Sequence, residues 1–251
     1  MIPHHAVDGS GEAVVAIGSL GATLEMWGPQ VGPLSERFRL VRFDTRGHGG
    51  STAVQAGQWS VEDLADDVAE LMDFVGAPSA HLVGISLGGA IAMTAALRHP
   101  GRVRKLALMS TAPKLGTVES WRERAATARA EGCGALADGA MQRWFTPRFR
   151  ESDPQVVADI RRRFAACDAE GYAACCEALS RWDLRGRLGG VEAETLVVYG
   201  TEDEVTTAAD AEAIAAEIDR ARIEPIEGAR HLVPTERADE VNRLLLDFLG
   251  E

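Results

Sequence analysis

The stretch Gly84-Ile85-Ser86-Leu87-Gly88 fits the pattern G-x-S-x-G and decides the fold. An apolar run, residues 80–83, precedes it, and a helix-like run of small residues, 89–97, follows it. A strand, a tight turn and a helix in this order present a nucleophilic serine at the turn. The flanking glycines permit the strained backbone that such a turn requires. We therefore expect Ser86 to be a nucleophile; a Gly-Ser turn that matches by chance is the alternative.

The composition fits one large domain without structural metals or disulfides. The 251 residues carry a formal charge of −12 at pH 7, and no long run of Lys or Arg interrupts this acidity. Such a balance argues against nucleic-acid or membrane-surface partners. No secretory signal pattern and no apolar run of membrane-spanning length is found, so a cytoplasmic protein is expected. Four cysteines without C-x-x-C spacing are expected to be free thiols: Cys133, Cys167, Cys175 and Cys176.

Strands and helices alternate over most of the chain. The expected strands are continuous apolar runs, which are typical of parallel sheets buried on both faces. They cover residues 13–17, 38–43, 80–83, 103–109, 195–199 and 221–226. A helix is expected to begin at Ser60, which forms a capping box with Asp63. This alternation predicts an α/β fold, a mostly parallel sheet with helices on both faces.

Between residues 113 and 188 the alternation stops. The segment is alanine-rich, helical in pattern and broken by glycines and prolines, and it contains no strong strand. The simplest interpretation is a helical insertion that folds as a cap over the carboxyl edge of the sheet. The whole chain, residues 1–251, is then a single domain with a cap at about 113–188.

A serine hydroxyl needs a base, which is itself oriented by an acid. His231 follows the last expected strand through a short loop, from which an imidazole can reach the sheet edge. His48 is interpreted as a structural loop residue. The remaining histidines lie at the N-terminus, where they are poor metal ligands, or at the wrong ends of expected elements: His4, His5, His81 and His99. His231 is therefore the expected base.

Asp203 is the expected acid. It stands three residues after Gly200, which follows the expected strand at residues 195–199, although its acidic neighbours also fit a solvated loop. The chain order Ser86, Asp203, His231 is the order of α/β hydrolases. Some members carry the acid one strand earlier, but that place, near Ser110, holds no carboxylate.

The oxyanion hole requires two backbone N–H groups aimed at the developing charge. Leu87, which follows the nucleophile, is expected to supply one of them. Leu20, in the loop after the first expected strand, is the candidate for the other.

These residues together resemble the α/β-hydrolase superfamily over nearly the whole chain. Within it the chain is similar to 3-oxoadipate enol-lactonase, the β-ketoadipate-pathway enzyme that opens an enol-lactone. The elbow and the Asp44–Gly49 string are shared by many hydrolases, whereas the cap strings are more specific. The similar strings are Ser19-Leu20-Gly21, Met26-Trp27, Pro29-Gln30, Asp44–Gly49, Gly84–Gly89, Arg143–Pro147 and Gly171-Tyr172.

Two features depart from the family. Relatives usually have two strands before the strand at 13–17, whereas only about a dozen residues precede it here, which predicts a shorter sheet at that edge. Gly18 stands where relatives have His or Asn in the oxyanion loop, so a supporting hydrogen bond of that loop is expected to be missing.

The resemblance implies acyl-enzyme chemistry on a small ester or lactone, with no metal and no cofactor. Such a substrate carries a carboxylate, for which Arg143, beside Trp144, is the expected contact. Residues 114–187 hold 13 Lys and Arg against 11 Asp and Glu, a net charge of +2, so that the remainder carries −14. A cationic cap over an anionic body is therefore expected to attract a small acid.

Other functions remain open for the same fold. A general carboxylesterase, a lactonase for another ring, a carbon–carbon bond hydrolase and a cofactor-free haloperoxidase would all use these residues. A ligand-sensing protein with little turnover is the alternative from a different class. Dehalogenases and epoxide hydrolases are disfavoured, because both require Asp in place of Ser86. The oligomeric state is left open.

Overall fold

The computed structural model describes residues 2–51 and 59–250. Within them, seven strands form one sheet in the order β1-β3-β2-β4-β5-β6-β7. Strand β1 runs antiparallel to β3, and every other neighbouring pair is parallel. The strands are β1 (His5–Asp8), β2 (Ala13–Ile17), β3 (Arg39–Phe43), β4 (Ala80–Ile85), β5 (Val103–Met109), β6 (Glu194–Gly200) and β7 (Ala221–Ile226). The expected mostly parallel sheet is confirmed.

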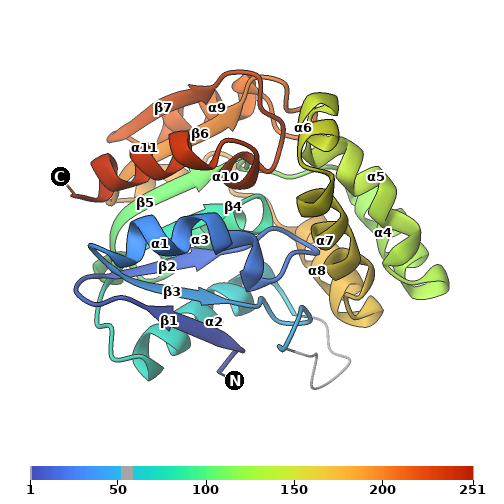
Figure 1. Ribbon diagram of the computed structural model, residues 1–251. Coiled ribbons are helices and arrows are strands. Elements are labelled where there is room, and N and C mark those ends of the chain that lie inside the picture. The colour runs from blue at the N-terminus through green and yellow to red at the C-terminus, as the bar shows by residue number, and fades with distance from the viewer. Residues whose placement is uncertain (1, 52–58, 251) are drawn as a thin grey trace.

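Helices cover both faces of the sheet (Figure 1). Helices α1 and α11 cross one face, and α2, α3 and α9 cover the other. Strands β2 and β4 are buried along their whole length, which explains their continuous apolar runs. The helices of this body are α1 (Gly28–Ser35), α2 (Val61–Phe74), α3 (Leu87–Arg98), α9 (Ala208–Glu217), α10 (Val233–Glu236) and α11 (Ala238–Gly250), with short 3₁₀ turns η1 (Leu24–Trp27), η2 (Pro100–Arg102) and η3 (Leu188–Gly190).

One strand was not expected from the sequence. Residues His5–Asp8 form the edge strand β1, paired from His5–Phe43 to Asp8–Leu40. Four residues of mixed polarity, most of them half-exposed, are too short to show an alternating pattern. The structure therefore places one strand, β1, before β2.

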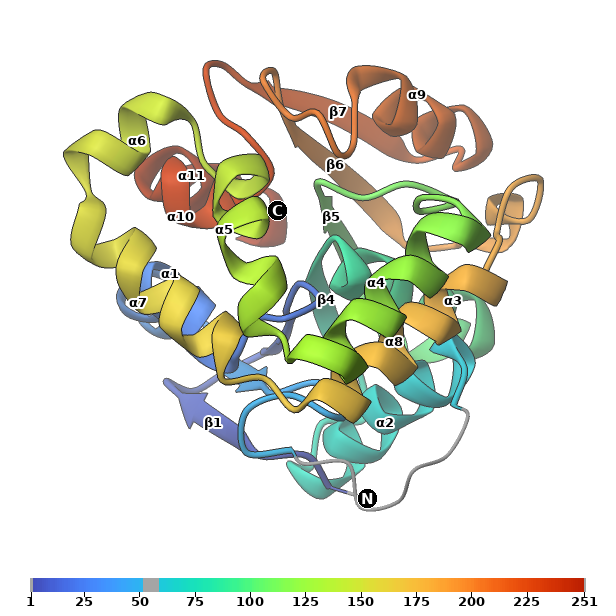
Figure 2. The ribbon, with the colours of Figure 1, turned by 90° about the vertical axis from the view of Figure 1, so that its right-hand side faces the viewer.

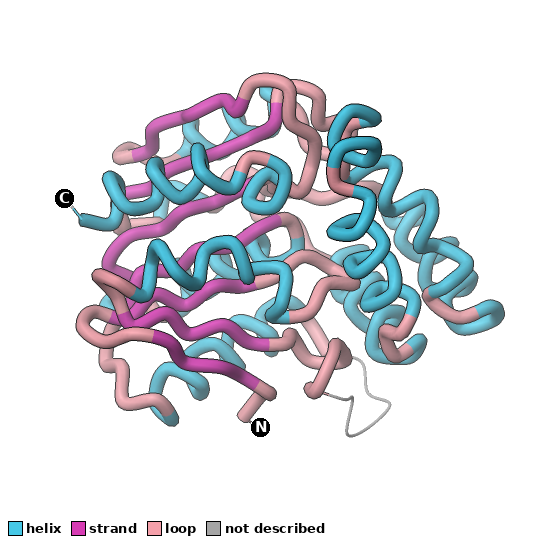
Figure 3. Tube along the Cα trace, viewed as in Figure 1, coloured by secondary structure: helices cyan, strands magenta, loops and turns pink. Residues whose placement is uncertain are grey.

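The segment between β5 and β6 is helical and gathers beyond one end of the sheet (Figure 2). Helices α4 and α8 lie side by side, and α5 packs against α7. Loops that leave the strands, drawn in pink in Figure 3, lie between this group of helices and the sheet. The elements are α4 (Val118–Glu131), α5 (Gly134–Trp144), α6 (Pro147–Ser152), α7 (Pro154–Ala165) and α8 (Ala169–Arg181). We refer to α4–α8 as the cap.

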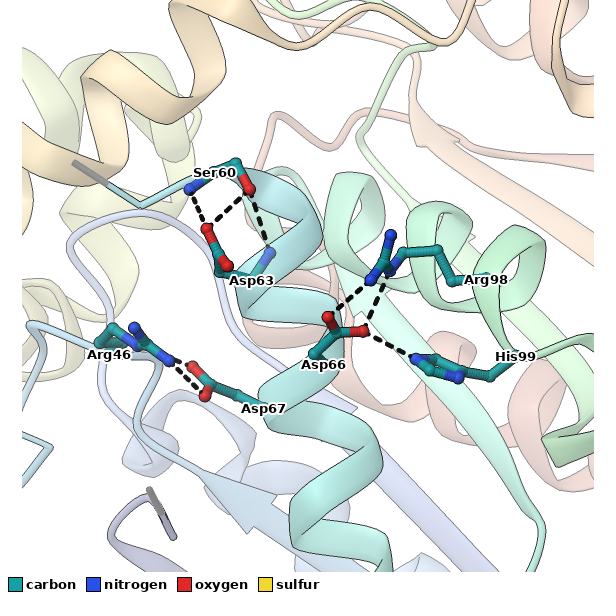
Figure 4. Close-up of polar contacts among 7 residues, drawn as sticks. All are labelled: Arg46, Ser60, Asp63, Asp66, Asp67, Arg98 and His99. Atoms are coloured by element: carbon teal, nitrogen blue, oxygen red, sulfur yellow. Dashed lines mark hydrogen bonds and ion pairs between the residues drawn. The ribbon is translucent and has the colours of Figure 1, made fainter.

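Helix α2 shows how side chains fix the elements around the sheet (Figure 4). The predicted capping box is confirmed, because the Ser60 hydroxyl accepts from the Asp63 amide at 3.2 Å while the Asp63 carboxylate accepts from the Ser60 amide at 2.7 Å. Further along the helix, Asp67 pairs with Arg46 and Asp66 with Arg98.

No helix in the described part of the chain is long and apolar enough to cross a membrane.

Candidate active site

Ser86 occupies the sharp turn between β4 and α3. Its φ of 56° and ψ of −117° lie outside the regions that a non-glycine residue ordinarily adopts. The turn is held from β5, where the Met109 carbonyl accepts from the Ser86 amide at 3.0 Å. The Thr111 hydroxyl donates to the Ser86 carbonyl at 2.9 Å. A strained backbone conformation that neighbouring hydrogen bonds hold in place is a feature of functional turns. It supports Ser86 as the candidate nucleophile.

The two glycines of the motif are required by close packing. A Cβ atom on Gly84 would overlap the Gly88 carbonyl, and one on Gly88 would overlap the Ile17 carbonyl of β2. Because neither residue has a Cβ atom, α3 can begin directly against the sheet edge. The first amides of α3, that of Leu87 included, therefore lie beside Ser86, where a helix N-terminus favours negative charge.

Asp203 and His231 form a buried pair. The His231 Nδ1 atom lies 2.8 Å from the Asp203 Oδ2 atom, and the side chains are 2% and 0% exposed. The Thr206 hydroxyl donates to the same carboxylate oxygen at 2.6 Å, and the Val205 amide donates to the other at 2.8 Å. Burial alone would raise the pKa of Asp203, but the His231 imidazole and these donors hold that pKa below its usual value.

This pairing determines what His231 can do. An ionised carboxylate only accepts hydrogen bonds, so Nδ1 carries the proton and Nε2 is left with a free lone pair. His231 and Ser86 line the same cavity, into which Nε2 can accept a proton from a nucleophile. The structure thus brings together the three residues that the sequence selected as nucleophile, acid and base.

The two expected oxyanion donors also lie at this cavity. Leu20 lines it directly, and Leu87 is the first residue of α3. Neither amide donates to a protein acceptor anywhere in the described residues, so both N–H groups can receive a ligand oxygen.

Two arginines of the cap reach into the cavity. Arg143 of α5 and Arg124 of α4 both line it and are half-buried. Neither forms an ion pair with an acidic side chain among the residues the structure describes. Burial and the nearby Arg124 charge lower the pKa of the Arg143 guanidinium from its usual value. A pair of half-buried cations without a counterion favours an anionic ligand.

Aromatic rings form much of the remaining wall. Trp144 and Phe164 meet edge to face, with ring centroids 5.5 Å apart, and Phe164 meets Tyr172 in the same way at 5.5 Å. Arg124 stacks on Trp121, its Cζ atom 4.8 Å from the ring centroid. The cavity therefore offers flat apolar surface beside two cations, which suits a small planar acid.

Sequence reasoning missed Arg124, Trp121, Phe164 and Thr206. The spacing of Trp121 and Arg124, three residues apart on one helix, could have shown that they share a face. Nothing in the sequence shows which face of a cap helix is turned to the sheet. Among the described residues no cluster of three His, Cys, Asp or Glu side chains could hold a metal, and the four cysteines are free thiols.

Fold and site together define a class of protein. The family model described as "alpha/beta hydrolase fold" matches residues 12–238, which is most of the chain. The chain belongs to the α/β hydrolase family.

Within this family, the chain is similar to enol-lactonases and to an esterase. A protein named 3-oxoadipate enol-lactonase 2, from Acinetobacter baylyi, is 35% identical over 230 residues, which are 92% of this chain and 85% of the relative. The crystal structure of the enol-lactonase from Burkholderia xenovorans LB400 superposes with a TM-score of 0.96 at 41% identity, covering 99% of this chain and 96% of that one. A thermophilic esterase from Thermogutta terrifontis, in a malate-bound structure, has a TM-score of 0.93 at 28% identity, covering 98% and 92%.

Proposed function

We propose that this hydrolase opens 3-oxoadipate enol-lactone to 3-oxoadipate. The relatives support a lactone substrate, because two proteins of 31% and 35% identity bear the name 3-oxoadipate enol-lactonase. The observation that carries the proposal for this chain is the pair of uncompensated guanidinium groups, Arg124 and Arg143, in the cavity that holds Ser86. Because the substrate is a small acid, its carboxylate supplies the missing counterion. A cytoplasmic setting is part of the same proposal.

The proposed reaction proceeds through an acyl-enzyme. Ser86 attacks the lactone carbonyl while His231 Nε2 accepts the hydroxyl proton, and Asp203 stabilises the imidazolium that forms. The Leu20 and Leu87 amides bind the oxyanion of the tetrahedral intermediate. Ring opening breaks the lactone C–O bond and expels an enolate, a better leaving group than an alkoxide, and the imidazolium of His231 returns its proton to this enolate, which becomes the ketone. Neutral His231 then accepts a proton from a water molecule that attacks the acyl-enzyme, and the proton passes to Ser86 as the keto acid is released.

The charge of the cap acts locally in this proposal. Three cap arginines outside the cavity pair with acids of the same cap: Arg129 with Glu170 and Glu177, Arg161 with Asp138, and Arg162 with Asp159. These pairs cancel one another at the surface. Arg124 and Arg143 differ from the other cap arginines in that they line the cavity that holds Ser86, so an anion that they bind lies at the reacting site.

We expect Arg143→Ala to raise the KM for 3-oxoadipate enol-lactone by about tenfold or more, because a charge-assisted hydrogen bond is worth about 1.5–3 kcal/mol. The KM for p-nitrophenyl acetate should stay unchanged, since that ester carries no anion. Arg122→Ala, which removes an exposed charge from the helix that carries Arg124, is the matched control. An unchanged KM for the lactone in Arg143→Ala would contradict this assignment.

A carboxylesterase or another lactonase would use the same Ser86, Asp203 and His231. A ligand-sensing protein differs, because it requires no activated serine. Stoichiometric labelling of Ser86 by an organophosphonate separates the two: a hydrolase is labelled and loses activity, and an unreactive Ser86 would favour the sensor.

A further inference from the structure

We propose that His48 is a positioning residue that holds the oxyanion loop, residues 18–21, in its working conformation. The Gly21 amide donates to the His48 Nε2 atom at 2.8 Å, and both residues are buried. Gly21 directly follows Leu20, the candidate oxyanion donor. His48 itself lines no part of the cavity, so it acts through the loop rather than on a substrate.

The donor determines the state of the imidazole. A backbone N–H can only donate, so Nε2 must be unprotonated and must accept. The proton therefore sits on Nδ1, which lies 3.2 Å from the Arg46 carbonyl oxygen and donates to it. His48 is thus fixed as one neutral tautomer that bridges two backbone segments.

The loop that carries His48 is itself firmly held. Arg46 makes two hydrogen bonds to the Asp67 carboxylate of α2, at 2.9 and 2.5 Å (Figure 4). The Asp44 carboxylate accepts from the Gly50 amide at 2.8 Å and, across the gap, from the Leu24 amide at 2.7 Å. The segment 44–50 therefore holds the last residue of the oxyanion loop through His48 and the chain just after that residue through Asp44.

The oxyanion loop has little support of its own. Gly18 has no side chain, and among the described residues the other side-chain bond to the loop backbone is a long one, from the Ser19 amide to the Met26 sulfur at 3.5 Å. A peptide group is planar, so holding the Gly21 N–H against His48 also fixes the direction of the Leu20 carbonyl. Gly21 has a φ of 82°, and because glycine can adopt φ of either sign, the residue itself does not prevent this peptide from rotating when the His48 bond is lost.

The sharpest test compares two amide substitutions. In His48→Gln the side-chain oxygen can reach the place of Nε2 and accept from Gly21, whereas in His48→Asn it reaches only the place of Nδ1. We expect His48→Asn to lower kcat for p-nitrophenyl acetate, and the rate of organophosphonate labelling of Ser86, by about tenfold or more with KM little changed, since loss of a whole oxyanion donor costs about a hundredfold or more. His48→Gln should stay within about threefold of the wild type.

Two results would overturn the proposal. One is an equal kcat for folded His48→Asn and wild type; the other is a protonated Nε2 in the wild type, seen in the ¹⁵N spectrum of the labelled imidazole, which requires no variant to fold. The proposal does not depend on the identity of the lactone. A wild-type Ser86 that fails to react with the organophosphonate would refute the proposed function, whereas equal labelling of wild type and His48→Asn would refute only the role of His48.

Discussion

At the residue scale, the site depends on conformations that are costly elsewhere in a protein. Ser86 has a positive φ, and Asp203 is a buried carboxylate. Each is compensated locally: β5 holds the Ser86 turn, and the Asp203 oxygens accept from His231, Thr206 and the Val205 amide. At these two positions, strain and burial therefore fall on groups that the proposed chemistry uses.

Asp203→Asn should lower kcat by about 10⁴-fold, because an amide cannot hold the same histidine tautomer. The neighbouring exposed acid gives the control, since Glu202→Gln should leave kcat unchanged. The depressed pKa of Asp203 stabilises the fold fully above the unfolded value of about 3.9, and this contribution is lost as the pH falls through the lower folded value. The free energy of unfolding of Asp203→Asn, measured in urea, should therefore depend less on pH in acid. Full activity of Asp203→Asn, or equal loss in Glu202→Gln, would contradict the assignment.

At the element scale, the end of α5 and the loop that carries His231 form one hydrogen-bonded unit. The Leu232 amide donates to the Trp144 carbonyl at 3.0 Å. The buried Glu236 carboxylate accepts from the Arg230 amide at 2.8 Å and, through its other oxygen, from the Thr146 amide at 3.0 Å and the Thr146 hydroxyl. The cap residues proposed to bind substrate are thereby fixed to the segment that carries the base.

Glu236→Gln should lower the free energy of unfolding by about 2 kcal/mol, because the new amide nitrogen must face a backbone N–H that needs an acceptor. Urea unfolding checks this value, with Glu227→Gln, an exposed position in the loop that carries His231, as the control. We also expect a lower kcat in Glu236→Gln. A variant as stable and as active as the wild type would show that the cap and the His231 loop are held independently of Glu236.

At the scale of the whole molecule, the sequence predicts those elements that a continuous run of apolar residues marks. Six strands follow from apolar runs, and the order of Ser86, Asp203 and His231 follows from residues placed at strand ends. The edge strand β1 is not predicted, because its four residues are too few to show an alternating pattern. The place of Arg124 in the cavity is not predicted, because tertiary packing decides which face of a helix is turned to the sheet. The contact of His48 with Gly21 is not predicted either, because it joins two loops that are far apart in sequence.

The most direct test of the proposed function is the steady-state hydrolysis of 3-oxoadipate enol-lactone, compared with that of p-nitrophenyl acetate by the same enzyme. We predict a kcat/KM of at least about 10⁴ M⁻¹ s⁻¹ for the enol-lactone. The neutral ester should be at least about tenfold poorer, because it cannot use Arg124 and Arg143. Ser86→Ala should turn over neither substrate. Fast cleavage of the neutral ester together with no turnover of the enol-lactone would contradict the account.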